Sequence, residues 1–230
     1  MSGERWTHGR RGGLTLLALA VVVAGVIVLI VAVRAQRSAP APPRSVGQID
    51  PSPSSSTPSI QPADKTPPPL GASEPVSINI PAIGVTSKVF SIGKAPDGTL
   101  AVPQPGPRLN QAAWFKNSPT PGQPGPSIIE GHVDSTSGPS VFFKLGNVRP
   151  GNKIKVTRAD GVHLEFTVQA VRDFPKAKFP TRLVYGAKNL GVPSLRLITC
   201  SDFDSSIRHH VGNEIVFAHL TKVTHRHTSK

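Results

Sequence analysis

Cysteine is almost absent from this chain: Cys200 is the only one in 230 residues. A single cysteine excludes an internal disulfide and any zinc site built on several thiolates. Acidic residues are also scarce, with 13 Asp and Glu against 26 Lys and Arg, and the formal net charge is +13. The basic residues form no dense run interleaved with aromatics. The charge therefore favours a membrane or an anionic cell wall over nucleic acid as a partner.

The first 75 residues are not typical of a folded core. Residues 1–13 are short and basic, and residues 14–33 form an apolar run without a charge. At ~1.5 Å per residue this run spans a ~30 Å hydrocarbon core. It predicts an uncleaved transmembrane signal anchor, since the apolar part of a cleaved signal peptide is usually only ~7–15 residues long. Residues 34–75, rich in Pro and Ser, predict a disordered linker that acts as a stalk or as a tether of no required reach.

From residue 76 the composition becomes that of a folded domain. Residues 76–223 alternate short β-prone runs with dense turn signals, and residues 224–230 form a polar tail. One or two short helices are expected, around residues 140–147 and within the long connection at 172–194. This pattern predicts an all-β domain built as a closed, eight-stranded barrel. The expected strands are residues 76–80, 85–92, 99–102, 111–115, a run from 127, 153–157, 162–171, 195–200 and 213–220.

Cys200 stands at the end of the strand predicted at residues 195–200, where a thiol can face either the core or a cleft. A catalytic thiol needs a base and a donor for the oxyanion. Among eight histidines, His132 is the strongest partner, because it ends an apolar run and follows a glycine; His209 and His210 remain open. Arg208 lies on the connection between the last two strands and is the candidate cation. Each residue taken alone also fits a purely structural role.

Several short motifs together resemble the sortases, membrane-anchored cysteine transpeptidases of Gram-positive bacteria. Residues 196–200 read Arg-Leu-Ile-Thr-Cys, close to the Thr-Leu-x-Thr-Cys signature of that family. Residues 130–135 read Glu-Gly-His-Val-Asp-Ser and look like its histidine motif, and residues 78–85 look like its first strand. The likeness is greatest to the actinobacterial class F group. The chain departs from that group where Ser201 and Asp202 replace two glycines after the cysteine.

The resemblance implies a function and a set of site residues. Cys200 is expected to attack the Thr carbonyl of a Leu-Pro-x-Thr-Gly-like sorting signal and to form a thioacyl enzyme. His132 is expected to exchange protons with the leaving and incoming amines, and Arg208 to stabilise the oxyanion. The acceptor is expected to be an amine of a peptidoglycan precursor, on the outer side of the cell membrane, with no metal or organic cofactor. The residues expected to line the peptide groove are Ile198, Thr199 and, on a neighbouring strand, Ile129.

Other classes of protein remain open at this point. One alternative is a non-catalytic wall-binding module on a stalk, with Cys200 buried in the core. A second alternative is a cysteine peptidase that only hydrolyses its substrate. Labelling of the folded protein with a thiol reagent separates the first of these from an enzyme, and addition of an amine acceptor separates the second.

Overall fold

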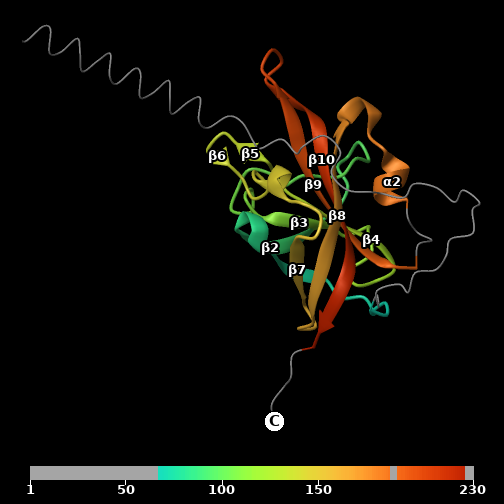
Figure 1. Ribbon diagram of the computed structural model, residues 1–230. Coiled ribbons are helices and arrows are strands. Elements are labelled where there is room, and N and C mark those ends of the chain that lie inside the picture. Colours follow the sequence, from blue (N-terminus) through green and yellow to red (C-terminus); the bar gives the residue numbers. More distant parts are fainter. Residues whose placement is uncertain (1–66, 187–190, 226–230) are drawn as a thin grey trace, which may run out of the picture. The chain divides into compact units, whose positions relative to one another are not determined.

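The computed structural model describes residues 67–186 and 191–225 (Figure 1). The predicted membrane anchor at residues 14–33, most of the predicted linker and the end of the tail lie outside the described residues. Within the described part of the chain, no helix has the length and apolar character needed to cross a bilayer.

Eight strands close into a barrel in the order β1-β2-β3-β4-β9-β10-β8-β7. The pairs β2–β3 and β4–β9 are parallel, and all the other neighbours in the barrel are antiparallel. The closed eight-stranded barrel predicted from the sequence is therefore confirmed. Its strands are β1 (Pro75–Ile80), β2 (Val85–Ile92), β3 (Ala112–Phe115), β4 (Gly125–Glu130), β7 (Lys153–Arg158), β8 (His163–Pro175), β9 (Pro193–Asp204) and β10 (His209–Thr224).

Small elements complete the fold. A two-stranded sheet pairs β5 (Asp134–Ser135) with β6 (Gly138–Pro139). The helices in the described residues are single turns or little more: the 3₁₀ turns η1 (Pro81–Ile83), η2 (Leu145–Asn147) and η3 (Lys176–Lys178), and the α-helix α2 (Thr181–Tyr185).

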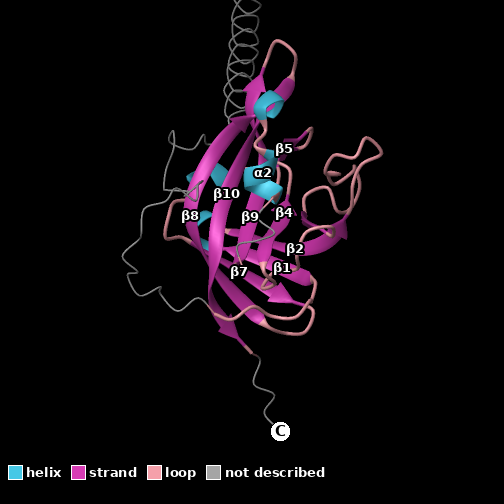
Figure 2. Ribbon diagram, turned by 90° about the vertical axis from the view of Figure 1, so that its right-hand side faces the viewer, coloured by secondary structure: helices cyan, strands magenta, loops and turns pink. Residues whose placement is uncertain are grey.

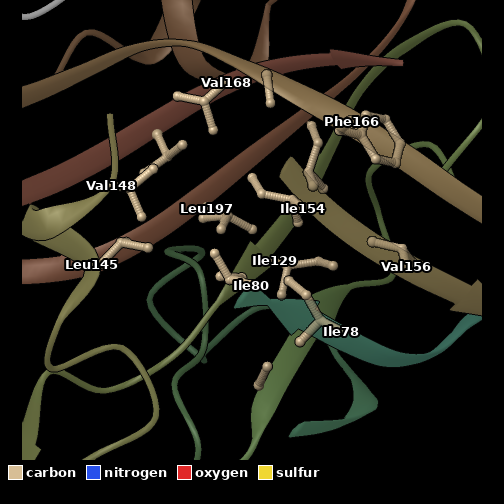
Figure 3. Close-up of a cluster of buried hydrophobic side chains, with 14 of the residues drawn as sticks. Ile78, Ile80, Ile129, Leu145, Val148, Ile154, Val156, Phe166, Val168 and Leu197 are labelled. Carbon is tan, nitrogen blue, oxygen red and sulfur yellow. The ribbon is translucent and has the colours of Figure 1, made fainter. Parts of the chain in front are cut away.

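The inside of the barrel is filled by aliphatic and aromatic side chains that alternate along each strand. On β7, Ile154 and Val156 are 0% and 1% exposed, whereas the residues on either side of Ile154 face solvent. Figure 3 shows these two residues meeting Phe166, Leu197, Ile129 and others in one cluster. The alternation of apolar and polar residues places one face of each strand in the core, as expected for a barrel.

A second apolar cluster lies on the outer face of the barrel. It joins residues of β4, β9 and β10 to the connection that follows β8. Figure 2 shows α2 lying over β9 and β4. Because β4 is covered on both faces, all six of its residues are buried. The buried members of this outer cluster are Phe115, Ile128, Ala170, Val184, Ile198, Ile215 and Phe217.

The short helical segment predicted around residues 140–147 is present as turns that end in the single turn η2. Two other local predictions differ from the structure. Residues 99–102 form no strand of the barrel, and Leu100 makes only an isolated bridge with Lys94. The last two strands extend well beyond residues 200 and 213, to a turn at residues 205–208. Figure 1 shows this long hairpin standing beyond the rest of the barrel.

The folded domain also begins earlier than residue 76. The amide of Leu70 donates to Gly122 O at 2.8 Å, and Leu70 packs against the inner core. The buried guanidinium of Arg158 donates to Gly71 O at 2.9 Å and bonds Asp160 at 2.6 Å. Residues 67–74 therefore lie against the barrel, although the sequence assigned them to the linker because of their proline content.

Candidate active site

Cys200 lies on the outer face of β9 and is partly exposed. It pairs with Asn213 of β10, which in turn pairs with Phe174 of β8, so the three residues form one row across three strands. Burial raises the pKa of the Cys200 thiol, and the charge and hydrogen bonding of the Lys176 side chain oppose this rise. The negative charge of Asp134, and that of Glu130 when it is ionised, raise the thiol pKa further.

Gly131 fixes the path of the chain as it leaves β4. The Thr199 hydroxyl donates to Gly131 O at 2.8 Å, and the Gly131 amide donates to Ile198 O at 3.1 Å. A Cβ at this position would lie 2.6 Å from a methyl carbon of Val141 and 2.9 Å from the ring of Phe142. Only glycine allows this close approach, so the residue that follows leaves β4 next to Ile198 and Thr199 of β9.

His132 is that residue, and one nitrogen of its ring has a fixed partner. Its Nε2 lies 2.8 Å from the carbonyl oxygen of Pro103. A carbonyl oxygen only accepts hydrogen bonds, so Nε2 carries a hydrogen in this arrangement and Nδ1 is the nitrogen left to gain or lose a proton. His132 can therefore accept one proton and later return it, as a general base and acid must.

Cys200 and His132 line one pocket, which has a volume of about 720 Å³. Its walls come from the segment after β2, from the ends of β3, β4 and β9, and from the connection that holds η3 and α2. The pocket brings together four of the residues predicted from the sequence: Cys200, His132, Ile198 and Thr199. Its other lining residues are Lys94, Gly98, Thr99, Leu100, Val102, Phe115, Glu130, Gly131, Lys176, Phe179, Thr181, Tyr185 and Asn213.

Ile129, expected in the peptide groove, lies elsewhere. It is 0% exposed and belongs to the inner core, since its neighbours Ile128 and Glu130 take the outer face of β4. A shift of one residue along a strand moves a side chain to the other face. The sequence was thus right about the strand and wrong about the face, and Glu130 lines the pocket in place of Ile129.

Arg208 also lies outside the pocket lining. The strands that flank it are neighbours, as expected, but they stay paired as far as Asp204 and His209. Arg208 therefore sits in the exposed turn at the tip of the hairpin, with φ of 54°. The sequence analysis expected Arg208 to return to Cys200 across a short connection. The structure has a long β9–β10 hairpin instead, so this expectation is wrong.

Glu130 is the main site residue that the sequence left without a role. It is 4% exposed, and its Oε1 has no hydrogen-bond partner among the described residues. Burial raises the pKa of this carboxyl to about 8, so it is largely protonated at neutral pH. An acidic residue at the end of an otherwise apolar run was the available sign. Lys176 gave no such sign, because it lies in an irregular connection.

His210 does not line the pocket but contacts the segment that follows His132. Its Nε2 lies 3.1 Å from a carboxylate oxygen of Asp134, two residues after His132. The ring of Phe203 meets the His210 ring edge-on at 5.2 Å. The contact with Asp134 joins the β9–β10 hairpin to the segment that carries His132, and the contact with Phe203 lies within the hairpin. No group of three or more His, Cys, Asp or Glu residues in the described ranges is placed to bind a metal ion.

A thiol and a histidine that line the same pocket, on the outside of a closed β-barrel, form an arrangement suited to a cysteine-dependent enzyme. The family model of the sortase domain matches residues 78–221, which covers all eight barrel strands in whole or in large part. The chain belongs to the sortase family, whose members are cysteine transpeptidases.

Solved structures share the fold. Sortase A from Corynebacterium diphtheriae superposes with a TM-score of 0.50 at 21% identity, covering 65% of this chain and 62% of that one. Sortase A from Listeria monocytogenes gives a TM-score of 0.50 at 18% identity, with coverage of 69% and 93%. This chain thus spans less than two thirds of the length of the Corynebacterium protein. No curated protein sequence matches significantly.

Proposed function

We propose that the protein is a membrane-anchored transpeptidase that cleaves a Leu-Pro-x-Thr-Gly-like sorting signal and transfers the resulting acyl group to an amine of the cell wall. Membership of the sortase family supports the reaction type. The observation that carries the proposal is the shared pocket of Cys200 and His132, which opens beside the outer apolar cluster and can hold an extended peptide. The sequence motifs favour the class F group within the family.

In the proposed first step, Cys200 Sγ attacks the Thr carbonyl carbon as a thiolate, and the carbonyl oxygen becomes an oxyanion. Collapse of this intermediate breaks the C–N bond to Gly, and His132 gives a proton to the leaving amine. The product is a thioacyl enzyme and a free amine. His132 starts this step protonated and ends it neutral.

In the second step an acceptor amine attacks the thioester carbonyl. The C–N bond forms, the C–S bond breaks, and the proton released by the amine passes to His132, which restores the thiolate and the imidazolium. Ile198 forms part of the pocket wall, and Thr199 holds Gly131 so that His132 keeps its position.

The location proposed for this chemistry is the outer face of the cell membrane. The uncharged run at residues 14–33 supplies a single-pass anchor, and the Pro- and Ser-rich residues that follow supply a tether. A substrate and a wall precursor held at the same membrane meet a tethered enzyme at a raised effective concentration. The partners in this scheme are secreted proteins with a sorting signal and the peptidoglycan precursor.

Mass spectrometry of the enzyme with a panel of sorting peptides tests the proposal. The expected result is an adduct on Cys200 with the mass of the peptide up to Thr, absent in Cys200→Ala. Adding an amine acceptor should convert the released product from acid to amide. An adduct that yields acid at every acceptor concentration would show a hydrolase, and no adduct with any peptide would remove the transpeptidase assignment.

A further inference from the structure

The oxyanion formed by the proposed reaction requires a donor or cation beside Cys200. Arg208 does not meet this condition. Four residue steps along β9 separate Cys200 from Asp204, the last residue paired before the turn that holds Arg208. At ~3.3 Å per strand residue, the backbone of Asp204 lies about 13 Å along β9 from that of Cys200, and Arg208 does not line the pocket. Another residue must supply the charge.

Lys176 is placed to do so. The row Cys200–Asn213–Phe174 brings the end of β8 next to the nucleophile, and Lys176 follows Phe174 by two residues, where β8 gives way to η3. Lys176 and Cys200 line the same pocket. Within the described residues its ammonium makes no ion pair with a carboxylate, so its charge is available to the site.

The electrostatics of the thiol agree with this geometry. Burial raises the pKa of Cys200, and Lys176 is the residue whose charge and hydrogen bonding lower it again. Lys94 also lines the pocket but makes no such contribution to the thiol. Glu130 and Asp134 face the thiol from the β4 end and raise its pKa. The stabilisation of a thiolate in this pocket therefore depends on the ammonium of Lys176.

We propose that Lys176 is the cationic catalytic residue of this site. Its ammonium pairs with the Cys200 thiolate before the reaction. It then donates a hydrogen bond to the carbonyl oxygen as negative charge moves from sulfur to oxygen, and it keeps its proton throughout. The inference rests on the proposed transpeptidase function for its second role and on the structure alone for its first.

Two measurements on Lys176→Ala test both roles. The kcat/KM for a sorting peptide should fall ~10²-fold or more, the usual cost of removing one oxyanion donor. The rate of Cys200 alkylation by iodoacetamide, followed against pH, should show a raised thiol pKa. Lys176→Arg should restore part of both, because arginine keeps the charge. Lys178→Ala is the matched control: it lies in the same turn, is exposed and does not line the pocket.

The outcomes are distinct. A loss of less than threefold in Lys176→Ala together with an unchanged alkylation profile would overturn the assignment, as would an equal loss in Lys178→Ala. A larger loss in Arg208→Ala than in Lys176→Ala would return the role to the hairpin turn. If the unmodified protein cleaves no peptide, the transpeptidase proposal fails. The alkylation profile still decides whether Lys176 stabilises the thiolate.

Discussion

The two faces of β4 and β9 are both buried, yet they differ in chemistry. The inner face carries Ile129, Leu195 and Leu197, each 0% exposed, and its buried polar side chain Ser127 is uncharged. The outer face carries Glu130 at 4% and Arg196 at 6% among its apolar residues. Burying a charged group costs free energy unless it is paired, and neither Glu130 Oε1 nor Arg196 Nε has a hydrogen-bond partner in the described residues.

The covering layer explains the difference. The inner face is enclosed by the other strands of the barrel and carries no ionisable side chain from β4 or β9. The outer face is covered by the connection between β8 and β9 that holds η3 and α2, and the pocket that Cys200 lines lies beside this connection. The inner face is therefore expected to determine stability and the outer face to determine activity.

The largest effect expected on the outer face is that of Cys200→Ala. Peptide cleavage should fall below detection, because no other thiol exists in the chain to form the acyl intermediate. The thermal unfolding midpoint should stay within a few degrees of the unmodified protein, since the side chain is partly exposed and small. Activity assays and calorimetry on the same preparation measure both. Cleavage that persists in this variant would mean that another group is the nucleophile.

Leu197→Ala is the corresponding change on the inner face. Leu197 is 0% exposed in the barrel core, and its truncation should lower the free energy of unfolding by ~2–5 kcal/mol. Its neighbour Ile198 lines the pocket, so Ile198→Ala should cost less stability and should raise KM for the peptide. Denaturant unfolding and steady-state kinetics on both variants make the comparison. Equal unfolding free energies for the two would remove the distinction between the faces.

Whether a strand is buried on one face or on both also determined how well its residues could be placed from the sequence. The period-2 alternation and the turn residues predicted the barrel and most of its strands. Cys200 and His132 were selected as candidates because each ends an apolar run, and the structure places both in one pocket. Ile129 was placed on the wrong face because every residue of β4 is buried, which erases the alternation. The positions of Lys176 and Arg208 depend on the paths of the connections between strands, and no local sequence pattern encodes those paths.

Glu130→Gln tests the buried carboxyl of the outer face through the pH dependence of the free energy of unfolding. The folded-state pKa of about 8 lies above the ordinary value of 4.5, so the folded protein binds the extra proton between these values. Its free energy of unfolding should therefore fall as pH rises through this window, by up to a few kcal/mol at ~1.4 kcal/mol per pKa unit. The glutamine variant lacks this loss, and its stability relative to the unmodified protein should increase from pH 5 to pH 8.

Glu214 of β10 provides the control for Glu130. Burial, reinforced by Asp173, raises its pKa to about 8 as well, but Glu214 does not line the pocket. The stability of Glu214→Gln relative to the unmodified protein should thus increase from pH 5 to pH 8, as expected for Glu130→Gln. Its rate of peptide turnover should not change. Urea unfolding at several pH values, combined with kinetics, distinguishes the two carboxyls. Identical kinetic effects of both substitutions would argue against a role for Glu130 in the pocket.

The smallest effect is expected for Arg196→Met, on the outer face but away from the pocket lining. The Arg196 guanidinium stacks 4.7 Å from the Phe217 ring centroid and donates to Leu195 O at 3.1 Å, while burial lowers its pKa to about 10. Replacing a buried charge by an apolar side chain of similar volume is often neutral or stabilising. The free energy of unfolding should change by ~1 kcal/mol or less, with unchanged kcat/KM. A loss of several kcal/mol would instead show that the cation–π contact holds the outer layer together.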